Sequence, residues 1–285
     1  MEENSRDALV DDSGWRAQLD LTFCHREPRT VLARNLHNGP LRVQKALYPE
    51  GPGICHVAIL HPPGGIVSGD SLTCHARLEE RARVCLTTPG ATKWYRCPEA
   101  SSRQHLRFSL ARGASLEWLP RENILFDGSR IHMQLEVELD TGATYIGWEI
   151  LCFGRRASGE RWRTGGLTLG ARVRHEGRLL WSERANILAA SGFATSPVGL
   201  AGFTVSATLV IAGPQTDAML LANCRQILPG DGTAQSGITS LPSLLLARYL
   251  GHSSEDAFNW LTSLWRLLRP AHLQVPAAAP RLWAC

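Results

Sequence analysis

The sequence predicts a mainly β fold: one domain of stacked strands with about two helices toward the C-terminal end. Short runs in which apolar and polar residues alternate recur from residue 17 to about Pro214, and such alternation marks strands with one buried face. Turns that contain glycine separate these runs at short intervals. The chain has 285 residues, of which 44% are hydrophobic and 20% charged, so it can bury a substantial core as a soluble globular protein.

The N-terminal part of the chain is expected to hold a tail followed by closely spaced strands. Residues 1–14 are polar and acidic and lack the apolar segment of a signal peptide, so we expect a disordered tail in a cytoplasmic protein. No apolar run approaches the ~20 residues that a membrane helix needs. Alternation from Ala17 to Phe23 predicts the first strand. Further strands are expected at 29–36, 42–48, 54–60, 71–78 and 82–88.

The middle of the chain is expected to form hairpins. Residues 106–110 alternate, turn at Arg112-Gly113 and return at Leu116. The cleanest period of two covers 131–139, which turns into 143–151. A third pair joins 167–173 to 178–183. Strands at short spacing with glycine turns indicate mostly antiparallel pairing.

Helices are expected only near the C-terminal end. Thr216-Asp217 can cap a short helix that runs through Arg225, and the small residues of 229–240 predict a loop. A longer helix begins at Ser253 or Ser254 and is expected to stop at Pro270. The domain is therefore placed at 15–275, with a Pro/Ala-rich tail at 276–285. We expect an apolar partner surface formed by Trp260, Leu264, Trp265 and Leu244–Leu246.

Two glycine-bearing loops between strands are the expected functional region, because rigid loops on a β scaffold commonly carry function. The first runs from His61, which is expected to fix the loop by a hydrogen bond, to Asp70, and the second runs from Thr87 to Arg96. Gly64 and Gly69 have the spacing of a phosphate loop, but Asp70-Ser71 stands where Lys-Ser/Thr is required, so we expect no nucleotide binding. The residues that define these loops are His61, Pro62, Pro63, Gly64, Gly65, Gly69, Pro89, Gly90 and Lys93.

Candidate metal and charge sites are spread along the chain. Cys-His dipeptides occur at 24–25, 55–56 and 74–75, but neighbouring strand residues point to opposite faces, so one dipeptide cannot chelate a metal. We expect mostly buried free thiols. Genome base composition is the favoured explanation for the excess of arginine over lysine in the chain. The segment Arg155–Arg184 nevertheless has eight arginines and three glutamates, which would suit an acidic protein partner better than nucleic acid.

Several carboxylates lie in apolar surroundings. Glu117 is interpreted as a residue on the solvent face of its strand. The run around Glu149 is apolar on both faces, so burial is expected there, and a buried carboxylate needs a partner or a cation. Asp70 would have the same requirement, and Glu183 follows another apolar run. Oxygen donors hold a divalent cation more loosely than thiolates do, which suits passage better than storage.

Four motifs in this order resemble the UreD (UreH) family of urease accessory proteins, and the resemblance runs from Trp15 to Pro270. The motifs are HPPGGIVSGD, TTPGATKWYR, LEWLPRENILFDGSR and GWEILCFGRRASGE. The resemblance implies a β-helix-like stack and a non-enzymatic chaperone that helps load nickel into urease. It also implies a transient nickel passage at Asp70, Thr92, Glu149 and Glu183, with no stably bound cofactor.

The resemblance implies partners as well: UreF, the GTPase UreG and apo-urease, with UreE as nickel donor. Two copies each of this chain, UreF and UreG would form the assembly, with no nucleic acid and no membrane. Two alternatives remain open. One is a β-scaffold hydrolase that uses the His61–Asp70 loop, although no local catalytic motif supports it. The other is a purely structural adaptor.

Overall fold

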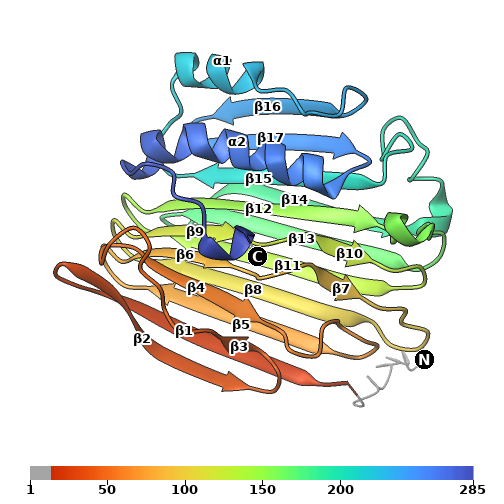
Figure 1. Ribbon diagram of the computed structural model, residues 1–285, viewed down its shortest axis with the longest axis horizontal. Coiled ribbons are helices and arrows are strands. Elements are labelled where there is room, and N and C mark those ends of the chain that lie inside the picture. Colours follow the sequence, from red (N-terminus) through yellow and green to blue (C-terminus); the bar gives the residue numbers. More distant parts are fainter. Residues whose placement is uncertain (1–13, 285) are drawn as a thin grey trace, which may run out of the picture.

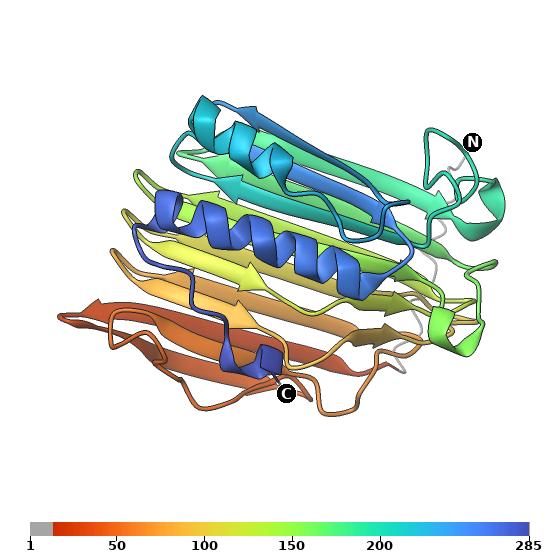
Figure 2. The ribbon, with the colours of Figure 1, turned by 45° about the horizontal axis from the view of Figure 1, so that its top comes forward.

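Two β-sheets that face each other form the body of the molecule, and a long helix covers the outer side of one of them (Figures 1 and 2). The computed structural model describes residues 14–284. The seven-stranded sheet has the order β14-β13-β11-β8-β5-β1-β2. Its strands are β1 (Arg16–Arg26), β2 (Arg29–Asn38), β5 (Ser71–Leu78), β8 (Ser102–Leu110), β11 (Arg130–Leu139), β13 (Gly166–His175) and β14 (Arg178–Leu188).

The ten-stranded sheet has the order β16-β17-β15-β12-β9-β6-β4-β3, with β10 and β7 attached beside β12. These strands are β3 (Arg42–Val43), β4 (Cys55–Leu60), β6 (Arg83–Thr87), β7 (Thr92–Trp94), β9 (Ser115–Leu119), β10 (Asn123–Leu125), β12 (Thr144–Phe153), β15 (Val205–Ala212), β16 (Gln235–Leu241) and β17 (Leu244–Gly251). The helices are α1 (Ala218–Gln226), α2 (Ser254–Leu273) and the short 3₁₀ turns η1 (Arg156–Ser158), η2 (Ala189–Ser191) and η3 (Arg281–Ala284). Within residues 14–284, no helix has both the length and the apolar character needed to cross a membrane.

The expected β-helix-like stack is confirmed, but the expectation of mostly antiparallel pairing is wrong, and so are two of the three expected hairpins. The chain passes from β5 to β6, from β8 to β9 and from β11 to β12, and each step crosses from one sheet to the other. Strands within the central part of each sheet therefore pair in parallel, as β5–β8, β8–β11, β6–β9 and β9–β12 do. Only β13 and β14 form the antiparallel hairpin that the sequence predicts.

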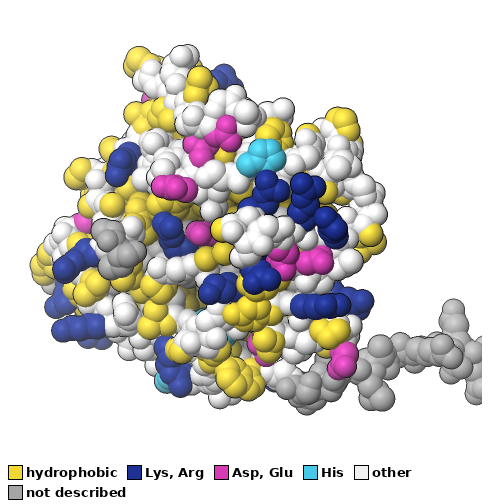
Figure 3. Space-filling view, turned by 45° about the vertical axis from the view of Figure 1, so that its right-hand side comes forward, with side chains coloured by type: hydrophobic (Ala, Val, Ile, Leu, Met, Phe, Trp, Pro, Cys, Tyr) yellow, Lys and Arg dark blue, Asp and Glu magenta, His cyan; other side chains and the backbone are white. Residues whose placement is uncertain are grey.

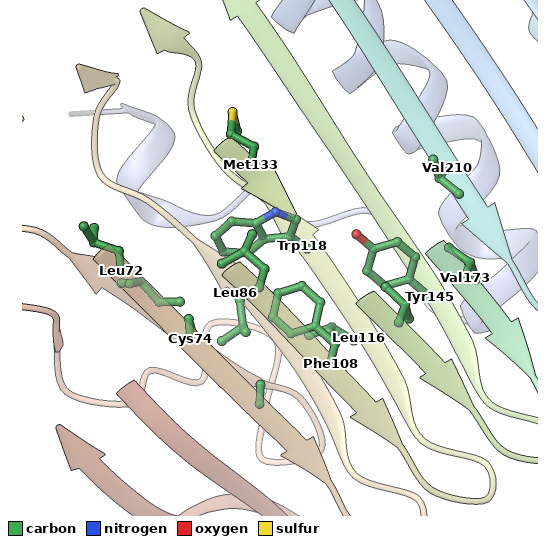
Figure 4. Close-up of a cluster of buried hydrophobic side chains, with 14 of the residues drawn as sticks. Leu72, Cys74, Leu86, Phe108, Leu116, Trp118, Met133, Tyr145, Val173 and Val210 are labelled. Carbon is green, nitrogen blue, oxygen red and sulfur yellow. The ribbon is translucent and has the colours of Figure 1, made fainter. Parts of the chain in front are cut away.

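Alternating side chains of the two sheets meet in one interior. Leu72 and Cys74 of β5 and Phe108 of β8 face Leu86 of β6 and Trp118 of β9 across it (Figure 4). The ring centroids of Phe108 and Trp118 are 5.7 Å apart. Packing of this kind explains why period-two alternation extends through both sheets: each strand has one face in this interior.

Helix α2 buries a second apolar cluster against the outer face of the ten-stranded sheet. Its side chains Trp260, Leu264 and Trp265 are at most 2% exposed, so the expected open partner surface on this helix is wrong. The helix also continues through Pro270 to Leu273, because a proline in the last turn removes only one backbone donor. Gln274 then closes the helix in a left-handed conformation.

A buried ion cluster fixes α2 to the sheet. The guanidinium of Arg269 is fully buried and donates to Glu117 at 2.9 Å and to Glu50 at 2.6 and 2.8 Å. The indole nitrogen of Trp265 donates to the same Glu117 carboxylate at 2.7 Å. Glu117 is 2% exposed, so its interpretation as a solvent-facing residue is wrong: it faces α2, not water.

Two further expectations need correction. Only Arg42–Val43 of the expected strand 42–48 forms a strand, and Leu47 makes a single bridge to His56. The expected loop 229–240 contains strand β16, which pairs with β17 at the edge of the sheet. Its residues are small and mostly exposed, with Ile238 buried, because an edge strand needs little apolar surface. In the part of the chain described, seven cysteines are free and six of them are buried, as expected.

Candidate functional site

The ten-stranded sheet is interrupted on one side of β12, between its ladder with β9 and its ladder with β10. Strand β9 pairs with β12 over Thr144–Gly147, and β10 pairs with β12 over Leu151–Phe153. The register of these described strands leaves 148–150 between the two ladders. The chain between β9 and β10 is Pro120–Glu122, and proline cannot donate to a ladder. Glu149 is therefore placed at an interruption of the sheet.

The first cavity adjoins this break and has a volume of about 200 Å³. It is lined by both glycine-bearing loops and by residues of the interior, among them His61, Thr92, Lys93, Asn123 and Glu149. Thr92 is held by its backbone nitrogen, which donates to the carbonyl oxygen of Glu122 at 2.8 Å. The cavity thus brings together two of the four residues of the expected passage, Thr92 and Glu149, and the loop residue His61.

The second cavity continues from the first and has a volume of about 60 Å³. The two cavities share Gln104, Leu106, Trp118, Trp148 and Glu149 as lining residues. Glu183, on strand β14 of the opposite sheet, lines the second cavity. Glu149 therefore lies at the junction of two adjoining cavities, with Thr92 in one and Glu183 in the other.

The environment of Glu149 favours its protonated form. Burial, followed by the negative charge of Glu183, raises the pKa of the Glu149 carboxyl to about 7. Gly147, two residues earlier on the same face of β12, leaves space that the hydroxyl of Tyr145 occupies: a Cβ at Gly147 would lie 2.0 Å from the Tyr145 oxygen. Near neutral pH, the Glu149 carboxyl can thus keep its proton, or a cation can displace the proton and bind the carboxylate.

Glu183 is not free in the structure. The guanidinium of Arg248, on β17, binds both Glu183 oxygens at 2.8 and 2.9 Å and also donates to the Thr208 hydroxyl at 3.3 Å. Thr208 lies opposite both Glu149 and Arg248 in the ladder, so the three side chains form one polar row across β12, β15 and β17. Any cation that binds Glu183 must compete with this guanidinium.

Asp70 has a different place. It is 3% exposed, and its two carboxylate oxygens accept from the backbone nitrogens of Trp15 and Val67, each at 2.9 Å. Asp70 does not line either cavity among the described residues. Its geometry is that of a side chain that closes the His61–Asp70 loop and ties it to the start of β1.

The imidazole of His61 lines the first cavity with its Nε2 atom buried and, within residues 14–284, without a hydrogen-bond partner. Burial lowers the pKa of His61, and the nearby Asp70 charge only partly opposes this effect. The ring is therefore neutral near pH 7 and carries a nitrogen lone pair. The sequence predicts a side chain that fixes the loop, but Asp70 does this, and the His61 ring remains available.

The candidate metal ligands of the interior, as far as residues 14–284 show, are spread along the two cavities. Within residues 14–284, no three side chains of the His, Cys, Asp and Glu types are grouped as metal ligands. The polar groups of the two cavities lie instead in succession: His61 and Thr92, then Glu149, then Glu183 with Arg248. Sequence reasoning missed Arg248. The signal that identified Glu149, a charged residue within an apolar strand, is present at Leu244–Gly251 too.

Comparison with known proteins identifies the family. The model of the UreD urease accessory protein family matches residues 16–284. The urease accessory protein UreD of Methylobacillus flagellatus is 48% identical over 98% of both chains, and that of Dechloromonas aromatica is 48% identical over 94% of both. A third, from Azoarcus sp., is 46% identical over 95% of this chain and 94% of its own. The chain therefore belongs to the UreD family of urease accessory proteins.

Proposed function

We propose that this protein is a cytoplasmic chaperone in the maturation of urease, and that nickel passes through its interior on the way to apo-urease. Membership of the UreD family supports the role in urease maturation. The position of Glu149 at the junction of the two cavities is the observation that carries the passage. Nickel is cargo in this proposal, and no cofactor is bound stably.

The chemistry of the two cavities supports transit rather than storage. A hydrated Ni²⁺ would meet single donors in succession: the His61 imidazole and the Thr92 hydroxyl, then the carboxylate of Glu149. Loss of the Glu149 proton, whose pKa is about 7, would supply a charge when the cation arrives. In the second cavity, Glu183 can bind the cation only when its ion pair with Arg248 breaks. This competition keeps the binding of the cation weak and favours its release.

Asp70 belongs to this proposal only indirectly. Its carboxylate oxygens are occupied by the backbone nitrogens of Trp15 and Val67, so it shapes the loop that carries His61. For the assembly we propose UreF, UreG and apo-urease as partners, with UreE as donor and two copies each of this chain, UreF and UreG.

A blocking substitution tests the passage. Glu149→Leu and Thr92→Leu place apolar side chains in the first cavity. The control Glu138→Leu makes the same change of residue type on strand β11, on the face of that strand that points away from the interior. Urease matured with each full-length variant is assayed for bound nickel and for activity, after circular dichroism has verified folding. We expect little nickel and little activity with the first two variants and normal values with the third.

The same experiment separates the alternatives. A structural adaptor tolerates Glu149→Leu as long as the assembly forms, so full activation by a folded Glu149→Leu protein would overturn the passage. The hydrolase alternative would require the pure chain to turn over a substrate at the His61–Asp70 loop. In that loop, both oxygens of Asp70 accept backbone bonds, which disfavours a role as a general base.

A further inference from the structure

We propose that one end of the molecule is a docking surface for an acidic face of a protein partner. The surface consists of Lys93, Arg96, Arg156, Arg161 and Arg163, and we call it the basic end. Lys93 belongs to β7 and Arg96 to the loop after it, and the other three lie in the connection from β12 to β13. The loop after β10 lies between these two segments, and all three loops are at the end of the sheets where β7 and β10 are labelled (Figure 1). Figure 3, which turns that side forward, shows dark-blue Lys and Arg groups spread over it.

Backbone hydrogen bonds join the three loops into one surface. The Cys97 nitrogen donates to the Gly128 carbonyl at 3.0 Å, and the Gly128 nitrogen donates to Thr164 at 3.1 Å. The Gly154 nitrogen donates to Leu125 at 2.8 Å. Because each loop is bonded to the next, the side chains they carry are presented together and lose little freedom when a partner binds.

Contacts between aromatic and arginine side chains also join the same loops. The guanidinium carbon of Arg155 lies 4.3 Å from the centre of the Phe126 ring, and the rings of Tyr95 and Phe126 pack edge to face at 4.8 Å. The Cγ of Arg96 lies 2.8 Å from the position that a Cβ on Gly128 would take. A side chain at Gly128 would displace Arg96, so the glycine allows this arginine to lie close over the loop.

Two acidic residues of these loops, Asp127 and Glu160, are already bound, whereas Glu99, in the loop after β7, is exposed. Asp127 accepts from the backbone nitrogens of Arg163 and Thr164, each at 2.7 Å. Glu160 is held by Arg155 at 3.0 and 3.1 Å. The five cations of the basic end are exposed, and the ion pairs in the described part of the chain include none of them. Their charge is therefore available to an external partner.

The basic end adjoins the first cavity. Lys93 lines that cavity, and the ring of Tyr95 covers Gly65, where a Cβ would lie 2.2 Å from the ring. A positive surface beside a cavity repels a free divalent cation. If the proposed function holds, the cation must therefore be handed over by, or to, a protein that is already docked. A metal-carrying protein surface rich in Asp and Glu fits this chemistry.

The surroundings of the arginines, and not the arginines themselves, favour a carboxylate-bearing protein over nucleic acid at this end. Arginine binds carboxylates and phosphates alike through two parallel hydrogen bonds, so other features must decide between the two partners. Base stacking would need open aromatic faces, yet Phe126 is covered by Arg155, and η1, a three-residue turn, cannot act as a recognition helix. A protein with an acidic face is therefore the occupant to which the proposal commits.

Charge reversal tests the proposal with the full-length protein. The variant carries Arg156→Glu, Arg161→Glu and Arg163→Glu. A control with the same change of net charge carries Arg81→Glu, Arg112→Glu and Arg178→Glu, which are exposed and lie at the opposite ends of the strands. Purified apo-urease and each of the other urease accessory proteins serve as separate probes in surface-binding kinetics at 50, 150 and 500 mM NaCl, concentrations that span roughly 14 to 4 Å of screening length.

We expect the basic-end variant to bind at least one of these proteins about tenfold or more weakly at the lowest salt concentration, mainly through a slower association rate. The control should stay within about twofold of the unsubstituted protein. Equal losses in both variants, or no loss in either, would overturn the proposal. Salt-sensitive binding to a 20-base-pair DNA duplex that only the basic-end variant loses, without any protein binding, would overturn it as well.

These experiments test the docking surface and the nickel passage independently of each other. Glu149→Leu alters the interior and should bind the protein probes normally while it fails to deliver nickel. If Glu149→Leu activates urease fully and the basic-end variant still loses binding, the docking surface stands and the passage is wrong. If Glu149→Leu blocks delivery and charge reversal has no effect on binding, the passage stands and the docking surface is wrong.

Discussion

Replacing Glu149 by Gln should stabilise the protein at alkaline pH, because Glu149, which is half-buried beside the charge of Glu183, has to be ionised there. Its pKa in the folded state is about 7, compared with 4.5 for an ordinary glutamate. At about 1.4 kcal/mol per pKa unit, this difference corresponds to about 3 kcal/mol of lost stability once the group is ionised in both states. The figure is an upper value for Glu149→Gln, since the amide must also find hydrogen bonds.

The direction of the pH dependence follows from the raised pKa. Below about pH 4.5, the carboxyl is protonated in both states, so its ionisation costs the folded protein nothing. Between pH 4.5 and 7 the unfolded chain releases its proton while the folded protein retains it, and the stability falls as the pH rises. Above pH 7 the full cost is present. The amide of the Glu149→Gln variant cannot ionise, so the advantage of this variant over the unsubstituted protein should grow across this window and then remain constant.

Urea denaturation at pH 5 and pH 8 measures the effect through the unfolding midpoint and slope. We expect the free energy of unfolding of Glu149→Gln, relative to the unsubstituted protein, to be about 2–3 kcal/mol higher at pH 8 than at pH 5, close to the value given by the pKa difference. Glu138→Gln serves as the control, because Glu138 lies partly exposed on the outer side of β11 near Arg174. A pH-independent difference for Glu149→Gln, or one that shrinks as the pH rises, would refute the reasoning.

Three other predictions concern groups that the site and the fold depend on. Arg269→Met should lower the free energy of unfolding by about 3–5 kcal/mol, because the buried carboxylates of Glu50 and Glu117 then lack their cation. Urea denaturation measures this loss, and a loss below about 1 kcal/mol would contradict the prediction. Arg248→Met frees Glu183, so Ni²⁺ should bind the purified protein several-fold more tightly by calorimetry and leave it more slowly, whereas unchanged affinity would show that Arg248 does not compete. His61→Phe should keep the fold, since the loop is closed by Asp70, yet reduce the nickel content of matured urease several-fold; normal nickel content in a folded variant would exclude the imidazole as a donor.

Local pattern was a good guide to the individual strands and to the interior face of each. Alternation at 131–139 corresponds to β11, and the run 71–78 corresponds to β5. The N-cap of the long helix at Ser253 is also as the sequence predicts: its hydroxyl accepts from the Asp256 nitrogen at 3.1 Å. These features depend on residues that are near one another in the chain, so the sequence alone contains them.

The pairing of the strands could not be obtained in this way. A glycine turn between two alternating runs serves a hairpin and a crossing between facing sheets equally well, since both bury one face of each strand. The turns at Arg112-Gly113 and Asp140–Gly142 are crossings, whereas Glu176-Gly177 is a hairpin. What decides between them is which other strands fill the neighbouring positions, and this is a property of the whole stack.

The sequence by itself determined that this protein is mainly β, that its two glycine-bearing loops stand between strands, and that Glu149 is a carboxylate in apolar surroundings. The tertiary structure decided which charges meet. It placed Arg248 on Glu183, turned Glu117 toward Arg269, and engaged Asp70 with backbone donors. The physical reason is that the free energy of a buried charge depends on partners that lie far away along the chain, 65 residues away for Arg248 and Glu183. Folding alone brings such partners within hydrogen-bonding distance.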